Sequence, residues 1–148
     1  MVSQKCQYAI RAVFELARQN GNGPVRIGDI AQIQAIPVRF LEAILNQLRQ
    51  AGFVQSKRGA GGGYYLTRQP GRITIGEIIQ FVDGPLSPVA CMAGEDSLKC
   101  SLRGKCVFIG LWRRAEKAAS DVYDQTSFQD LLDDQTVMNK TASLSYSI

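Results

Sequence analysis

Hydrophobic residues recur every three or four positions in the first half of the chain, and this period predicts three helices. The first spans residues 4–19 and ends at a glycine-rich stretch. A short second helix spans about residues 27–32, and the third runs over residues 37–50, where Gly52 ends it. The third helix is expected to bury one apolar side, made of Phe40, Leu41, Ile44, Leu45 and Leu48.

A β-hairpin is predicted directly after the third helix. Residues 53–57 and 64–68 have the composition of short strands, and the glycine-rich segment between them is too long for a two-residue turn. Two helices joined by a tight turn and followed by a hairpin have the element order of a winged helix-turn-helix. We therefore expect a mainly α (α+β) fold with a winged helix-turn-helix domain over residues 1–84.

The second half of the chain is predicted to hold three more helices. Thr74 and Glu77 form a capping-box pattern at the start of a helix over residues 75–82. A long amphipathic helix is expected from 107 to about 124, and a short one over 128–132. The chain then divides into a cysteine-rich loop (85–106), dimerisation helices (107–134) and a polar flexible tail (135–148). The apolar side of the long helix consists of Phe108, Leu111, Trp112, Ala115, Ala118, Ala119, Val122 and Tyr123.

Charge separates the two halves of the chain. Residues 1–75 carry ten Lys or Arg and three Asp or Glu, a net +7, whereas residues 76–148 carry seven and ten, a net −3. A basic half of this kind indicates a polyanionic partner for the first domain only. The chain has no histidine, which removes the commonest general base, so we do not expect an enzyme.

The predicted DNA contacts lie on the third helix and in the hairpin loop. Arg39 is placed to reach a base edge or a phosphate, and Glu42 can accept from a cytosine amino group. Glycines in the loop let backbone N–H groups approach phosphates, and Arg58 can enter a minor groove. A phosphate-binding P-loop is the alternative, but it needs Gly-Lys-Ser/Thr opening a helix, and this loop leads into a strand. The expected contact set is Arg26, Val38, Arg39, Glu42, Ala43, Lys57, Arg58, Gly59, Ala60 and Gly61.

A specific set of residues runs through this region. It comprises Ile30, Ala31, Ile36, Pro37, Phe40, Leu41, Glu42, Ile44, Leu45, Leu48, Ala51, Gly52, Phe53, Val54, Ser56, Arg58, Gly59, Gly61, Gly62, Gly63, Tyr64 and Leu66. In this pattern the chain resembles the Rrf2 family of bacterial winged-helix transcription regulators over about residues 3–125. The resemblance implies a homodimer that binds a double-stranded DNA operator. It also implies that Arg58 lies in the minor groove while Arg39 and Glu42 face the major groove.

Three cysteines in the loop are candidate metal ligands. Cys91, Cys100 and Cys106 are spaced C-x8-C-x5-C, and three thiolates in an irregular loop can converge on one metal centre. Soft thiolates select iron–sulfur clusters, zinc or copper(I). Lys99, Arg103 and Lys105 lie between or beside them and would offset the thiolate charge. Packing cysteines and structural zinc are the alternatives, although a zinc knuckle usually shows a CxxC pair, which this chain lacks.

The resemblance implies an iron–sulfur cluster at these cysteines, with 2Fe–2S favoured and 4Fe–4S open, although the first spacing is longer than in most cluster-binding members. Some members take a histidine as fourth ligand, but the matching position here is Ile109. Others take an acidic residue from the first helix of the other subunit, near Gln7, and Cys6 is beside it. We therefore expect Cys6 of the partner subunit as fourth ligand. Ordinary packing of Cys6, a ligand role for Glu95 or Asp96, and an exogenous thiol or water are the alternatives.

The sequence thus predicts a regulator that senses iron–sulfur, redox or nitric-oxide status. The alternative is a cluster-free member of the family that uses thiol switches or a protein partner in sulfur or cysteine metabolism. No apolar run approaches the roughly 20 residues of a membrane helix, and the N-terminus has no apolar signal core. We therefore expect a cytoplasmic protein without a membrane partner.

Overall fold

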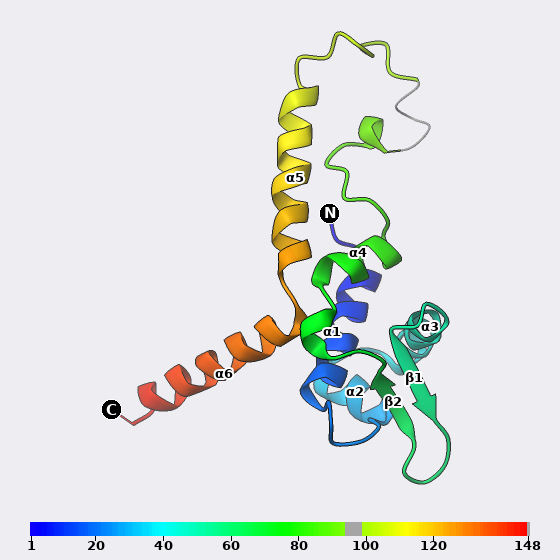
Figure 1. Cartoon of the computed structure of the whole chain (residues 1–148), viewed down its shortest axis with the longest axis vertical. Coiled ribbons are helices and arrows are strands. Elements are labelled where there is room, and N and C mark those ends of the chain that lie inside the picture. The colour runs from blue at the N-terminus through cyan, green and yellow to red at the C-terminus, as the bar shows by residue number, and fades with distance from the viewer. Residues whose placement is uncertain (94–98, 148) are drawn as a thin grey trace.

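Six α-helices and one two-stranded hairpin make up the protein in this computed structural model, which describes residues 1–93 and 99–147. The helices α1–α4 and the hairpin form a packed body, and the last two helices extend from it in different directions (Figure 1). The predicted mainly helical fold with a small sheet is confirmed. No helix in these described ranges combines the length and apolar character that crossing a bilayer requires.

The first three helices are α1 (Gln4–Arg18), α2 (Ile27–Gln34) and α3 (Val38–Gln50). Ala35 adopts a left-handed conformation (φ 50°) that ends α2, and the Ile36 N–H then donates to the Ala31 carbonyl at 2.9 Å. Pro37 caps α3 rather than forming its first residue. The tight turn between α2 and α3 is therefore present, as the sequence predicted.

The buried side of α3 is the predicted one with a single correction. Leu41, Ile44, Leu45 and Leu48 are all at most 3% exposed, whereas Phe40 is 56% exposed. Phe40 precedes Leu41, so its side chain lies about 100° around the helix from the buried row. The prediction that Phe40 belongs to the core was therefore wrong, and the ring lies on the outer surface of α3.

The hairpin consists of β1 (Val54–Lys57) and β2 (Gly63–Leu66), which pair antiparallel with Val54 opposite Leu66. A third segment joins it, because Val25 and Tyr64 exchange two backbone hydrogen bonds of 2.8 Å. A Cβ on Gly63 would lie 2.4 Å from the Val25 carbonyl oxygen, so this close approach requires glycine. The wing is thus attached to the chain just before α2.

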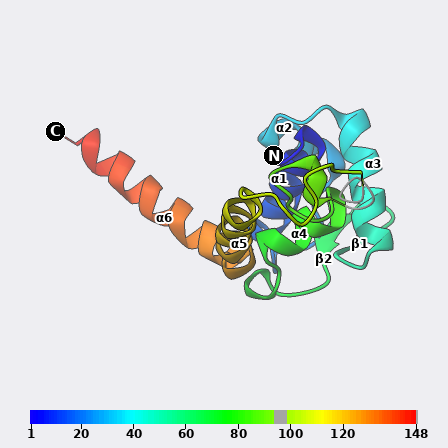
Figure 2. The same cartoon turned by 90° about the horizontal axis from the view of Figure 1, so that it is seen from above.

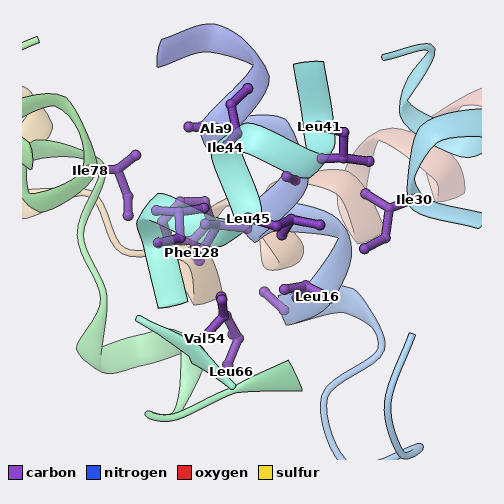
Figure 3. Packing of buried hydrophobic residues seen from close by; sticks show 14 of the residues in the cluster. Ala9, Leu16, Ile30, Leu41, Ile44, Leu45, Val54, Leu66, Ile78 and Phe128 are labelled. Carbon is purple, nitrogen blue, oxygen red and sulfur yellow. The ribbon is translucent and has the colours of Figure 1, made fainter. Parts of the chain in front are cut away.

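The core is a single hydrophobic cluster. Figure 3 shows side chains from α1, α2, α3, the hairpin and the C-terminal region converging inside the body. Complete burial of one Val, Leu, Ile or Phe side chain contributes about 1.5–3 kcal/mol to folding stability. The largest fully buried apolar members are Phe128, Leu16, Ile30, Leu41, Leu45, Leu48, Ile73, Ile78, Ile79, Val13 and Val54.

A buried carboxylate ties α2 to α1. Glu15 is fully buried, and one of its oxygens accepts from Arg18 Nη2 at 2.9 Å while the other accepts from Gln34 Nε2 at 3.0 Å. These partners supply the hydrogen bonds that a buried charge requires. Because Gln34 is the last residue of α2, this network fixes the end of α2 that leads into the turn.

The C-terminal part begins with the 3₁₀ turn η1 (Pro70–Arg72) and α4 (Ile75–Val82), whose predicted Thr74–Glu77 capping box is present. After η2 (Ala90–Met92), the long helix α5 (Ile109–Gln125) starts two residues later than predicted. Residues 73–75 then pair with residues 126–128 through two backbone hydrogen bonds, from Ile75 to Thr126 and from Phe128 to Ile73. The junction of α5 with the last helix is therefore anchored to the body.

The last helix, α6 (Phe128–Ser145), is much longer than predicted. Ser127 and Asp130 form a capping box at its start, and no glycine or proline interrupts the segment that follows. The expected helix end at residue 132 was therefore wrong, and most of the segment expected to be a polar flexible tail (135–148) is helical. Viewed down α5, α6 leads away from the body (Figure 2).

Candidate nucleic-acid interface and cysteine pocket

The outer side of α3 presents the residues that the sequence assigned to DNA. The exposed residues there are Val38, Arg39, Glu42 and Ala43. Half of the surface of Val38 is accessible to solvent. The side of α3 that carries Leu45 packs against α1, so the helix is held firmly while the opposite side stays open. This is the arrangement that a recognition helix needs in order to enter a major groove.

Arg49 links α3 to the wing. Its guanidinium donates to the Asn46 side-chain oxygen and to Ser56 Oγ on β1, both at 3.3 Å. The helix α3 and the hairpin are therefore connected on their exposed side as well as through the core. This connection was not predicted from the sequence, because it joins residues on different elements.

The tip of the wing is a narrow, exposed turn. Lys57, Arg58, Gly59 and Ala60 are exposed, and the Gly62 N–H closes the turn by donating to the Gly59 carbonyl at 3.0 Å. A Cβ on Gly62 would lie 2.2 Å from the Lys57 carbonyl oxygen, so the turn has no room for a larger residue there. The backbone of the tip is accessible, as contact with a groove or a phosphate requires.

Three cations of this surface differ from Arg18, Arg49 and Arg68 of the same domain. Arg18, Arg49 and Arg68 donate to neighbouring side chains. The side chains of Arg39, Lys57 and Arg58, by contrast, make no hydrogen bond or ion pair within residues 1–93 and 99–147. Cations without an internal partner remain available for phosphates or base edges.

Replacing Arg58 with alanine is expected to weaken operator binding by about 1–3 kcal/mol, the scale of a specific base contact. The reason is that Arg58 begins the wing tip and has no structural partner in the described part of the chain. Gel-shift titration at fixed salt measures the effect, with Lys140→Ala as a control that removes the same charge on α6. Equal affinities of the two variants would contradict the assignment of Arg58 to the interface.

The three loop cysteines line one pocket. Cys91 lies in η2, Cys100 and Cys106 lie in the turns before α5, and each is free and half-buried. The cavity measures about 280 Å³. Its other lining residues are Leu102, Arg103, Gly104, Ile109, Trp112 and Arg113. The structure therefore brings together the three residues that the sequence singled out as metal ligands.

The donor set of this pocket suits a soft metal centre. Thiolates are the ligands that iron–sulfur clusters take, and the guanidinium groups of Arg103 and Arg113 add positive charge beside them. The sulfur atoms do not converge, however: within the described residues no group of three ligating side chains is close enough to hold one metal ion. The pocket thus has the chemistry for a cluster in a more open arrangement than a bound state requires.

Two of the pocket residues add to what the sequence indicated. Arg113 was not identified because it lies on α5 rather than in the loop, although its position four residues after Ile109 places both on one side of the helix. Trp112 was assigned only to the apolar side of α5, and it also lines the pocket. Ile109, at the position of a histidine ligand in some members of the resembled family, offers no ligand atom.

Cys6 lies apart from the other cysteines. It is fully buried in the core on α1, and burial, with the negative charge of Asp83 as a smaller cause, raises the pKa of its thiol to about 12. A thiol with this pKa is protonated at neutral pH, whereas the thiolate is the form that binds metal. Within its own subunit Cys6 is a packing residue. The alternative ligands Glu95 and Asp96 lie outside the described residues.

The start of the cysteine loop is tied to α1. The carboxylate of Asp83, the C-cap residue of α4, accepts from the Ser3 backbone N–H at 2.8 Å and from the Ser3 hydroxyl at 2.5 Å. Ser3 in turn caps α1 by accepting from the Cys6 N–H at 3.1 Å. The loop therefore leaves the body from a point fixed to the N-terminus of α1.

Comparison with known proteins connects these features. The Rrf2 family profile, described as an iron-dependent transcriptional regulator, matches residues 2–134. The chain is 38% identical to the HTH-type transcriptional regulator CymR of Bacillus subtilis over 130 residues, which is 88% of each protein. It is 33% identical to the HTH-type transcriptional regulator IscR of Xenorhabdus nematophila over 138 residues, 93% of this chain and 82% of that protein.

Solved structures agree with the sequence comparisons. The structure of T. potens IscR has a TM-score of 0.74 at 34% identity and covers 91% of this chain and 88% of its own. The structure of CymR, the global cysteine regulator of B. subtilis, has a TM-score of 0.72 at 37% identity. The match covers 88% of this chain and 95% of the CymR chain. One relative is thus named for cysteine regulation, and the matching profile for iron.

Proposed function

Because the chain belongs to the Rrf2 family of DNA-binding transcription regulators, we propose that it is a homodimeric repressor or activator that senses iron–sulfur, redox or nitric-oxide status through a cluster. Its relatives are named as transcriptional regulators and not as enzymes. The observation that carries the sensing part is the single pocket that Cys91, Cys100 and Cys106 line together with two arginines. A regulator that reads chromosomal DNA acts in the bacterial cytoplasm.

The proposed DNA complex uses two separate surfaces of the winged domain. The exposed side of α3, with Arg39 and Glu42, enters the major groove, while Arg58 at the wing tip enters the minor groove. Lys57 and the glycine-rich backbone contact the phosphates between them. The support for this arrangement is the exposure of these residues and the positive charge of the first 75 positions.

The proposed dimer forms along α5. This helix has 17 residues and none of them is buried, although Leu111, Ala115, Ala118 and Val122 lie on one side of it. The two alanines between larger residues allow the backbones of two such helices to approach closely. A helix with an open apolar side requires a partner, and a second copy supplies the same side by two-fold symmetry.

Replacing Val122 with aspartate is expected to convert the dimer to a monomer, because it places a charge in the apolar row far from the cysteine pocket. Light scattering after size exclusion measures the mass. Lys117→Asp puts the same carboxylate on the outward side of α5, where Lys117 is 74% exposed, and is expected to leave the dimer intact. A dimeric Val122→Asp variant would contradict the role of α5.

The sensing step is proposed to act on the ends of the cysteine loop. A bound cluster supplies a redox-active centre whose potential depends on charge and exposure around it. Arg103 and Arg113 offset the thiolate charge, and Ser3 with Asp83 holds the first end of the loop against α1. A change in loop conformation thereby reaches both α1 and the proposed dimer helix, which together set the spacing of the two recognition helices.

A cluster-free thiol sensor is the second candidate. It is favoured by the 38% identity to CymR and by three free, half-buried cysteines within one pocket. In that case an oxidant removes two electrons and two protons from a pair of these thiols to form a disulfide, or one thiolate exchanges with a low-molecular-weight disulfide, forming a mixed disulfide and releasing a thiol.

Anaerobic purification with iron and sulfide determination tests the proposal. We expect a coloured protein with stoichiometric iron and acid-labile sulfide. We also expect the cluster-loaded and metal-free forms to differ in their affinity for a duplex selected from random sequence. A colourless protein that takes up no iron or sulfide on anaerobic reconstitution would reject the cluster and favour the thiol sensor. Absence of any sequence-selective DNA binding by both forms would reject the operator-binding role.

A further inference from the structure

Arg26 connects the helix-turn-helix to the tip of the wing. It is the cap residue of α2, and its carbonyl accepts from the Asp29 and Ile30 N–H groups at 3.1 Å each. Its side chain extends away from the helix, and Nη2 donates to the Ala60 carbonyl at 2.8 Å. One residue thus joins the start of α2 to a position 34 residues later in the chain.

The wing tip has little other support. Among the described residues, no other hydrogen bond links residues 58–61 to a different element of the protein. The pairing of Val25 with Tyr64 holds the base of the hairpin but lies beyond the turn. A cavity of about 360 Å³, lined by Arg26, Ile33 and Gly61 among others, separates the tip from α2. The Arg26 side chain crosses this gap.

The Arg26 side chain differs from those of the other cations of the surface because it already has a partner in the protein. The side chains of Arg58 and Lys57 have no partner within the described chain, whereas the Arg26 guanidinium is already engaged with a backbone carbonyl. A wing tip of small residues is mobile unless it is held. If the tip became ordered only on DNA, the conformational entropy lost would weaken DNA binding. A tether that orders the tip beforehand removes that cost.

We propose that Arg26 is a positioning residue that holds the wing tip through Ala60, so that Arg58 and α3 meet DNA in one fixed geometry. Its effect on affinity passes through the wing and not through a phosphate. The inference rests on the DNA-contacting role of the wing proposed above. It replaces the direct contact that the sequence suggested for Arg26.

The test measures DNA affinity as a function of salt, using a duplex selected from random sequence by the wild-type protein. Arg26→Ala is expected to weaken binding about two- to tenfold, the scale of one hydrogen bond, with an unchanged salt dependence. Loss of a phosphate contact would instead reduce the slope of log K against log salt by about 0.9. Lys140→Ala controls for the change in net charge.

A double-mutant cycle with Arg58→Ala shows whether Arg26 acts through the wing. Once Arg58 is removed, Arg26→Ala is expected to add little, because the residue that it positions is gone. Hydrogen exchange of the peptide spanning residues 57–64 gives a readout without DNA, and it is expected to be faster in Arg26→Ala than in wild type. These two results would distinguish a tether from a direct contact.

Three outcomes would overturn the inference: unchanged affinity of Arg26→Ala, a reduced salt slope, or unchanged exchange in the wing peptide. The role of the wing itself is judged separately. If Arg58→Ala binds DNA like wild type, the wing does not contact DNA and the proposal above fails. If Arg58→Ala weakens binding and Arg26→Ala does not, only the positioning role of Arg26 fails.

Discussion

Serine at any one of Cys91, Cys100 or Cys106 is expected to abolish cluster binding, so that the anaerobically purified variant is colourless and contains no acid-labile sulfide. A serine hydroxyl is a harder and much less acidic ligand than a thiol, and the pocket offers no fourth sulfur to replace the one removed. The three variants are expected to behave alike, because all three sulfurs line the same cavity.

The measurement is iron and sulfide per chain together with the visible absorbance spectrum. Thermal unfolding of the metal-free proteins provides the folding control, since the three half-buried thiols contribute little to the core. A variant with wild-type iron content would remove that cysteine from the ligand set. Loss of the cluster in none of the three would leave the thiol-sensor function as the explanation of the pocket.

Cys6→Ala belongs to the same series and tests the prediction that the partner's Cys6 is the fourth ligand. The complete burial of Cys6 on α1 means that it would reach another subunit only if the core opened. We therefore expect this variant to keep its iron and to lose only some stability. Loss of iron would establish the intersubunit ligand, and the fourth position otherwise falls to Glu95, Asp96 or an exogenous molecule.

Local patterns predicted the elements of this fold well because their signals lie within a few residues. The spacing of Leu41, Ile44, Leu45 and Leu48 defines the buried side of α3, and the Thr74–Glu77 capping box places the start of α4. The glycine-rich wing was recognised for the same reason. A contact such as that of Arg49 with Ser56 depends on how two elements pack, and the sequence holds no local signal for it.

The failures have two further causes. Phe40 is apolar but lies on the outer side of α3, and hydrophobicity alone does not distinguish a core position from an apolar position in an interface. The last helix was ended too early because the segment after residue 135 is polar. In the structure the Thr136 and Thr141 hydroxyls donate to carbonyls one turn earlier and the helix continues.

The cysteine pocket could be predicted only in part. The spacing of the three cysteines indicated a shared site, and they do line one pocket, but it did not indicate that Arg113 and Trp112 of α5 would complete the lining. The burial of Cys6 was equally hidden, since a small residue on an amphipathic helix fits the core or a ligand role equally well. In both cases the deciding information is the packing of α1 and α5 against other elements.

Replacing Phe128 with alanine is expected to lower the free energy of unfolding by about 3–5 kcal/mol, the cost of removing a buried aromatic ring. Phe128 is fully buried although it begins α6, the helix that otherwise projects from the body. Its N–H also donates to the Ile73 carbonyl at 3.0 Å, so the residue anchors the α5–α6 junction to the winged domain. The ring is therefore the main apolar link between the DNA-binding part and the helices after the cysteine loop.

Phe40→Ala is the matched control, because it removes the same ring from a position that is 56% exposed. This variant is expected to change the free energy of unfolding by no more than about 0.5 kcal/mol. Urea unfolding of both variants at one protomer concentration provides the comparison, since dimerisation makes stability depend on concentration. Similar losses in the two variants would show that Phe128 is not an anchor. If α5 transmits the state of the cysteines, a folded Phe128→Ala protein should also retain DNA binding while losing its response to the cluster, because its junction with the body is loosened.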